Sequence, residues 1–143
     1  MKTVAIIALV IVSASASTVI FKNNCKDAFD VVRTENLKLP VVQCHLNPRG
    51  ECRGQFANNR SMNFKRGWGG KQTLAEFTFD NPKKRDFFDL SVVAGFDVPM
   101  SLSGNHYKLK CRHPKCPDAY LFDRDDKKNH DGPTGATYHV TFC

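Results

Sequence analysis

The sequence has almost no long apolar run. The one unbroken run covers only residues 4–12, whereas a membrane-spanning helix needs about 20 apolar residues. Lys2 precedes this run and the small residues Ala14, Ser15 and Ala16 follow it, which is the pattern of a secretory signal peptide. We therefore expect a signal peptide over residues 1–16, a secreted mature chain over residues 17–143, and no stable membrane insertion.

Helical periodicity is also lacking. No segment keeps apolar residues at positions i, i+3, i+4 and i+7 over three turns. Short β-branched and aromatic segments are instead separated by clusters of Gly, Pro, Asn and Asp, a pattern that favours a β-sandwich or barrel. The mature part is therefore predicted to be one all-β domain, without repeat or linker, and we expect a monomer. The predicted strands lie near residues 18–21, 29–34, 73–79, 86–93 and 136–142, and residues 47–72 are predicted as loop.

The basic residues form no block. Lysine and arginine number 21 against 14 aspartates and glutamates, which gives a formal net charge of +7, but they are spread along the chain. Scattered basic residues are typical of a solvated exterior, and no nucleic-acid recognition motif is present. We therefore expect no nucleic-acid partner.

All the cysteines lie in the predicted mature part. An even number in an exported chain predicts three disulfides, although six cysteines permit fifteen pairings. Neither their spacing nor that of the histidines matches a zinc site, so we expect no metal and no other cofactor. The six are Cys25, Cys44, Cys52, Cys111, Cys116 and Cys143.

Several segments, taken in order from end to end, resemble motifs of the thaumatin-like family, the pathogenesis-related family 5 proteins. Their ordered combination is much more specific than any one of them. The resemblance implies a thaumatin-like β-sandwich or flattened barrel stapled by disulfides. The segments are residues 19–25 (VIFKNNC), 73–77 (TLAEF), 86–91 (DFFDLS), 95–100 (GFDVPM), 116–120 (CPDAY) and 140–143 (VTFC).

The resemblance also implies a cysteine pairing. In the family the first cysteine pairs with one at the C-terminus, a local pair brackets a Gly-rich loop, and a third bridge lies at the edge of a large disulfide-rich insertion. That insertion is absent here, so the chain resembles the small, insertion-deleted type. The implied pairs are Cys25–Cys143, Cys44–Cys52 and Cys111–Cys116.

The family has an acidic cleft, described as one Arg, one Glu and three Asp, that is taken to bind β-1,3-glucan and that hydrolyses it weakly in some members. The resemblance places three of these residues at Glu76, Asp89 and Asp126, while Ala94 replaces another Asp and residues 39–43, just before Cys44, contain no Arg. Hydrolysis needs two carboxyl groups at a controlled separation, one of them held protonated. Glu76 and Asp89 are the pair that would do this, but the missing charges favour binding over catalysis.

Three functions are implied. The first is a secreted defence protein of antifungal type that binds β-1,3-glucan or another cell-wall polysaccharide. The second is a module that binds a foreign secreted protein, as a hydrolase inhibitor or an effector. The third, a weak endo-β-1,3-glucanase, is the only enzyme among them.

Two further residues stand out in the irregular middle of the chain. Asn59 begins an N-glycosylation sequon, Asn59-Arg60-Ser61. Trp68, the only tryptophan, lies in a Gly-rich segment, and we expect it to anchor this segment on the core rather than to stack on a ligand.

Overall fold

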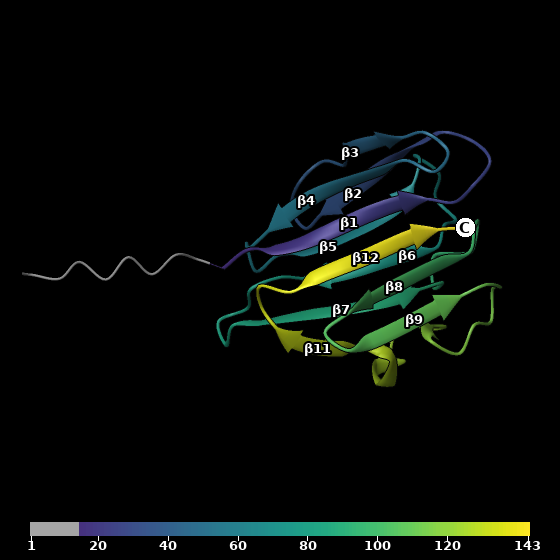
Figure 1. The fold of residues 1–143 in the computed structure, drawn as a ribbon. Coiled ribbons are helices and arrows are strands. Elements are labelled where there is room, and N and C mark those ends of the chain that lie inside the picture. The colour runs from purple at the N-terminus through teal and green to yellow at the C-terminus, as the bar shows by residue number, and fades with distance from the viewer. Residues whose placement is uncertain (1–14) are drawn as a thin grey trace, which may run out of the picture.

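The computed structural model describes residues 15–143, so residues 1–14 of the predicted signal peptide lie outside the described part. The described residues form two β-sheets that lie face to face as a sandwich (Figure 1). A short 3-10 turn, η1 (Asp126–Lys128), follows the tenth strand. Nothing helical in residues 15–143 has the length and apolarity to cross a membrane.

Five strands make the smaller sheet, in the order β4-β1-β12-β8-β9, and seven make the larger one, in the order β10-β7-β6-β5-β2-β3 with β11 also paired to β7. The strands are β1 (Ser17–Asn23), β2 (Phe29–Glu35), β3 (Val41–Leu46), β4 (Glu51–Phe56), β5 (Ser61–Arg66), β6 (Leu74–Thr78), β7 (Arg85–Ser91), β8 (Met100–Gly104), β9 (Tyr107–Cys111), β10 (Ala119–Tyr120), β11 (His130–Pro133) and β12 (Thr137–Phe142).

The first and last strands lie side by side in the smaller sheet (Figure 1). β1 and β12 pair in parallel from Thr18 opposite Thr137 to Asn23 opposite Phe142. Parallel neighbours need a long connection, and here that connection is the rest of the domain. The smaller sheet is therefore completed only when the two ends of the domain meet.

Three disulfides fix the ends and two of the turns, and they follow the pairing that the resemblance implied. One of them joins the segments that follow β1 and β12, with Cα atoms 5.1 Å apart. The other two close short loops, and the described residues contain no free cysteine. The three bridges are Cys25–Cys143, Cys44–Cys52 and Cys111–Cys116.

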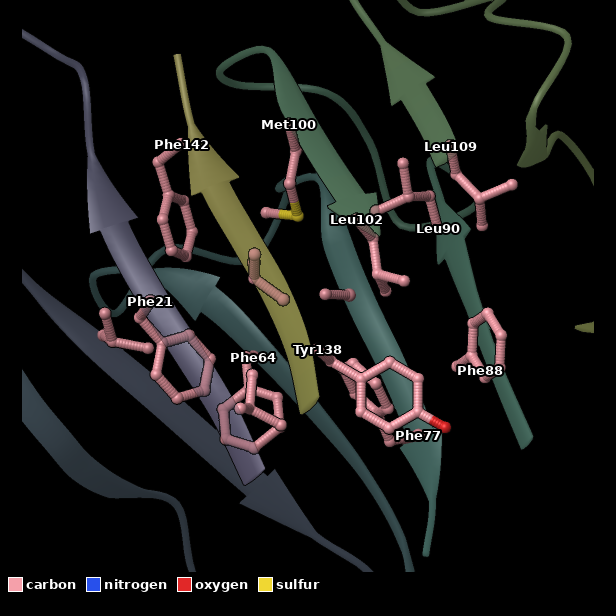
Figure 2. Packing of buried hydrophobic residues seen from close by; sticks show 14 of the residues in the cluster. Phe21, Phe64, Phe77, Phe88, Leu90, Met100, Leu102, Leu109, Tyr138 and Phe142 are labelled. Atoms are coloured by element: carbon pink, nitrogen blue, oxygen red, sulfur yellow. The ribbon is translucent and has the colours of Figure 1, made fainter. Parts of the chain in front are cut away.

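Aromatic side chains fill the space between the sheets (Figure 2). The ring of Phe77, on β6, has its centroid 4.8 Å from that of Phe79, 5.3 Å from that of Tyr138 and 5.9 Å from that of Phe64. Tyr138 lies on β12 of the opposite sheet, so the cluster connects the two layers. The Phe77–Phe79 pair is stacked and the other two are edge-to-face, and ring pairs at such distances add stability beyond the area that they bury.

The strands predicted from sequence are confirmed as β1, β2, β6, β7 and β12. The loop predicted for residues 47–72 is wrong, because β4 and β5 lie inside it. In β5 the buried Met62 and Phe64 alternate with Ser61 and Asn63 on the outer face, but only these two apolar residues carry the alternation, within a segment rich in Gly, Asn and Arg. β4 is an edge strand whose side chains are largely exposed, so its composition resembles that of a loop.

Candidate functional site

A row of polar side chains crosses the outer face of the larger sheet. Along β6, Ala75 and Phe77 are buried in the core, so Glu76 between them points to the other face. Glu76 pairs with Asn63 of β5 on one side and with Asp89 of β7 on the other. Cross-strand partners have Cβ atoms about 4.5–5.5 Å apart, so the strand register itself brings these three side chains together.

This row lies in a groove with a volume of about 850 Å³. Four carboxylates line the groove: Glu76, Asp89, Asp123 and Asp126. Among the residues that the structure describes, neither a lysine nor an arginine lines it, although the chain has a formal net charge of +7. The groove is therefore an acidic site on a basic protein.

The turn η1 supplies Asp126 to the groove. Lys128, in the same turn, is directed to the Asp125 carboxylate at 3.2 Å and to the Ala119 carbonyl at 3.1 Å. The lysine is thus held by partners other than the Asp126 carboxylate. Asp126 itself accepts a hydrogen bond from the Tyr120 hydroxyl at 3.5 Å.

Tyr120 is surrounded by the acidic groups of the groove. Burial raises the pKa of its hydroxyl, and the negative charges of Asp89, Asp126 and Glu76 raise it further, to about 12. Tyr120 therefore keeps its proton at neutral pH and remains a hydrogen-bond donor inside the groove.

The carboxyl groups of Glu76 and Asp89 share one environment. Burial raises the pKa of both groups, and the charge of Glu76 raises the pKa of Asp89 further. Asp89 Oδ1 is buried and has no hydrogen-bond partner among the described protein atoms. A single proton held between the two carboxyl groups would remove the repulsion and give this oxygen a partner.

The groove brings together the three carboxylates that the resemblance pointed to, Glu76, Asp89 and Asp126, and Ala94 lines it beside them. Sequence reasoning missed the fourth, Asp123, which lies between β10 and η1 in a segment that carries no motif. Its position three residues before Asp126 was the one available signal.

Two residues from the irregular middle of the chain are now placed. Asn59, the predicted glycosylation residue, lies between β4 and β5 in the chain. It is exposed and lines the groove. The expectation that Trp68 anchors its segment on the core is wrong, because 59% of this residue is exposed. Residues 67–70 bring glycines to both sides of it, and they give it little to pack against.

Residues 15–143 contain no group of three His, Cys, Asp or Glu side chains placed to hold a metal ion.

Comparison with known proteins gives consistent matches. The model of the thaumatin family matches residues 39–114. A thaumatin-like protein of rice (Oryza sativa subsp. japonica) is 46% identical over half of this chain, and the match covers 40% of the rice protein. Thaumatin-like pathogenesis-related protein 4 of oat (Avena sativa) is 29% identical over 96% of this chain and 94% of its own length. The chain thus spans less than half of one relative and nearly all of another.

Two solved structures share the fold. The protein elicitor MoHrip2 from Magnaporthe oryzae superposes with a TM-score of 0.68 at 19% identity, over 90% of this chain and 99% of that one. The thaumatin-like xylanase inhibitor TLXI superposes with a TM-score of 0.64 at 14% identity, over 87% of this chain and 98% of that one. Both likenesses concern the fold alone.

The family match covers more than half of the chain, and the disulfide-stapled β-sandwich agrees with it. The chain belongs to the thaumatin family, and several of its relatives are named pathogenesis-related proteins.

Proposed function

We propose that the chain is a secreted defence protein whose groove binds β-1,3-glucan or a related cell-wall polysaccharide without cutting it. The observation that supports this most is the groove itself, which has four carboxylates, one protonated tyrosine and no lining lysine or arginine among the described residues. Sugar hydroxyls donate hydrogen bonds, and carboxylates that are free of cations are strong acceptors for them. The groove would thus offer an uncharged glucan several acceptors and the Tyr120 hydroxyl as a donor.

Binding is favoured over hydrolysis by the placement of Glu76 and Asp89. A glycosidase holds its two carboxyl groups about 5–9.5 Å apart, on either side of the bond that breaks. Here the two side chains are direct cross-strand neighbours on the same face, and the charge of one acts strongly on the other. Such strong coupling favours one proton shared between the two groups over two groups that act separately on either side of a glycosidic bond.

Replacing Glu76 with glutamine should therefore weaken binding of the secreted protein to insoluble β-1,3-glucan by at least about tenfold. A hydrogen bond to a charged acceptor contributes about 1.5–3 kcal/mol, and 1.4 kcal/mol corresponds to a factor of ten. The measurement is the fraction of protein that pellets with glucan particles, together with the sugar released into the supernatant. No release of sugar is expected.

The matched control is Glu51→Gln, which removes an exposed carboxylate on β4 of the smaller sheet, whereas the groove crosses the larger sheet. It should leave pelleting unchanged.

Ala94→Asp adds a carboxylate to the groove lining and should strengthen pelleting. Because a glycan on Asn59 would stand at the groove, protein with and without enzymatic deglycosylation should be compared. Equal pelleting of Glu76→Gln and the unchanged protein would remove the groove from the glucan proposal.

A second candidate, a module that binds a foreign secreted protein, is favoured by a different surface. The turn between β2 and β3 exposes Leu37 fully and Leu39 at 86%. Leu37 has φ = 65°, a left-handed conformation that costs a branched side chain roughly 1–2 kcal/mol. The turn is nevertheless fixed, since Lys38 N–H bonds to the Glu35 carbonyl at 3.1 Å. Val41 and Val42 beside them are also exposed, and contiguous exposed apolar side chains are typical of a contact surface.

The double variant Leu37→Ser/Leu39→Ser tests this second candidate. One structural neighbour is by name a xylanase inhibitor, so microbial xylanases are the probe. If this candidate holds, the unchanged protein inhibits a xylanase and the double variant inhibits at least about tenfold less, a loss of 1.4 kcal/mol. Thermal stability should be the same for both, because exposed substitutions change it by less than about 0.5 kcal/mol. Inhibition that survives the double substitution would exclude this turn.

A further inference from the structure

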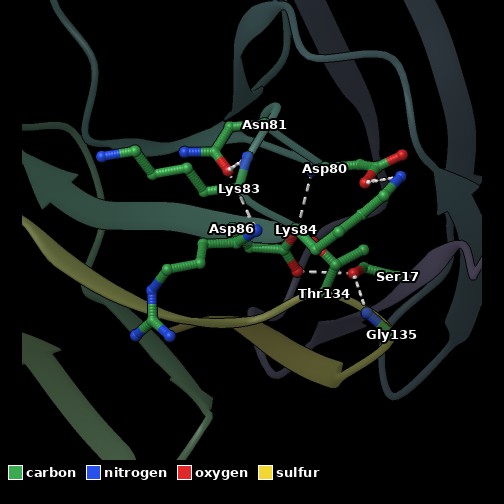
Figure 3. A network of polar contacts seen from close by, with 9 residues as sticks. Ser17, Asp80, Asn81, Lys83, Lys84, Asp86, Thr134 and Gly135 are labelled. Carbon is green, nitrogen blue, oxygen red and sulfur yellow. Dashed lines mark hydrogen bonds and ion pairs between the residues drawn. The ribbon is translucent and has the colours of Figure 1, made fainter.

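Asp86, at the start of β7, has a completely buried carboxylate. Its Oδ1 accepts hydrogen bonds from the Asp80 backbone N–H at 2.9 Å and from the Thr134 hydroxyl at 3.0 Å. Its Oδ2 accepts from the Ser17 hydroxyl at 2.5 Å and from the Tyr138 hydroxyl at 3.0 Å. Figure 3 shows Ser17 at the start of β1, Asp80 before β7 and Thr134 before β12 gathered around Asp86. The four donors indicate an ionised acceptor at their centre.

No cation pairs with this carboxylate among residues 15–143. The two basic residues beside it in sequence are occupied elsewhere: Lys84 pairs with Asp80 at 3.0 Å and Arg85 pairs with Asp131. A buried charge that is held only by neutral donors remains costly, since burial removes its hydration. A positive group near the carboxylate would therefore stabilise this site.

Ser17 offers the place for that positive group. It is completely buried at the first position of β1, its hydroxyl donates to Asp86 and its hydroxyl oxygen accepts from the Gly135 N–H at 2.9 Å. The nitrogen of a serine is three covalent bonds from its own hydroxyl oxygen and so lies within about 4 Å of it. With the 2.5 Å hydrogen bond, the Ser17 nitrogen lies within about 6–7 Å of the Asp86 carboxylate.

The predicted signal-peptide cleavage changes the chemistry of this nitrogen. Hydrolysis breaks the C–N bond between Ala16 and Ser17: water adds its hydroxyl to the Ala16 carbonyl carbon and a proton to the Ser17 nitrogen. The α-amine that results takes a further proton from solvent at neutral pH and becomes an ammonium group. An ammonium group has three hydrogens, so it can keep a bond in the β-sheet and also face a nearby carboxylate.

We propose that Asp86 is the internal counter-ion of the α-ammonium group that processing creates on Ser17, so that removal of the signal peptide completes the polar network at the start of β1. The buried setting strengthens the attraction between the two charges relative to water. In the uncut chain the Ser17 nitrogen belongs to a neutral amide. The residues before it reach the surface at Ser15, which is exposed and lies close to Gly135. The proposal rests on the predicted cleavage site and is independent of what the groove binds.

The test compares two full chains that are secreted by a eukaryotic host. One is unchanged, and the other has Gly-Gly inserted between Ala16 and Ser17, so that every side chain of the network remains while the ammonium group moves away. Mass spectrometry of the secreted N-terminal peptide establishes where each chain begins. The unchanged protein should start at Ser17 and melt at least about 3 °C higher than the inserted one.

Asp86→Asn in both chains should abolish this difference in melting temperature, because the counter-ion is gone. If the Asp86 variants are not secreted, the rate at which acetic anhydride acylates the α-amine gives the same answer in the two chains that keep Asp86. The rate should be at least tenfold slower at Ser17 than at the inserted glycine. Equal melting temperatures, a difference that persists in Asp86→Asn, equal acylation rates or a mature chain that starts elsewhere would each overturn the proposal.

Discussion

Removal of the bridge between Cys25 and Cys143 is expected to lower the free energy of unfolding by about 4–5 kcal/mol, the value of the chain-entropy model for a loop of this length. The two cysteines are separated by 118 positions, nearly the whole described chain. They also hold together the ends of β1 and β12, which pair in parallel in the smaller sheet. The double variant Cys25→Ala/Cys143→Ala should show this loss in urea unfolding followed by circular dichroism under non-reducing conditions.

The matched control is Cys44→Ala/Cys52→Ala, which opens a bridge between positions only eight apart. The same model assigns this short loop about 2–3 kcal/mol, and neither of its cysteines is in the buried core. The difference between the two double variants therefore measures the effect of loop length. Losses of equal size would contradict the view that the long bridge acts by restricting the unfolded chain.

The sequence predicted the strands whose two faces differ strongly. Residues 137–142 alternate buried Tyr138, Val140 and Phe142 with exposed or partly exposed residues, and such a period of two is visible without any structure. β4 and β5 were missed because only one or two buried apolar residues carry the alternation in each, Phe56 in β4 and Met62 and Phe64 in β5. β4 is an edge strand with one buried residue, Phe56, and β5 is recognised only when its outer Asn63 is seen to face a polar groove.

The site was predictable only in part for a similar reason. Glu76 and Asp89 lie on paired strands within motifs that resemble the family, so the resemblance identified both and the strand register explains why they meet. Asp123 lies in a turn with no pattern of its own, and its contribution depends on how the chain folds back after β10. The absence of lysine and arginine from the described groove lining is likewise a property of the folded surface, and the scattered basic residues did not indicate it.

The shared environment of Glu76 and Asp89 predicts an unusual dependence of stability on pH. Both carboxyl groups have a raised pKa, Asp89 chiefly through burial and then through the charge of Glu76. The folded protein therefore keeps a proton that the unfolded chain has lost above about pH 4. Folding then takes up a proton, so the free energy of unfolding falls as pH rises, by up to about 1.4 kcal/mol per pH unit for one proton, until the folded pair also ionises.

Asp89→Asn should remove this dependence and stabilise the protein at neutral pH by at least about 1.4 kcal/mol, the equivalent of one pKa unit. The asparagine amide can donate to Glu76, so the neighbouring carboxylate loses its repulsive partner and keeps a hydrogen bond. Urea unfolding at pH 5, 6, 7 and 8 measures the effect as the difference in unfolding free energy between variant and unchanged protein, in which the contributions of all other titrating groups cancel.

Asp126→Asn is the matched control, because it removes an exposed carboxylate from the same groove and should shift stability by less than about 0.5 kcal/mol at every pH. A difference between Asp89→Asn and the unchanged protein that stays constant from pH 5 to pH 8 would mean that the folded pair holds no extra proton. The groove that is proposed to bind glucan would then carry two full negative charges at its centre, on Glu76 and Asp89, instead of one.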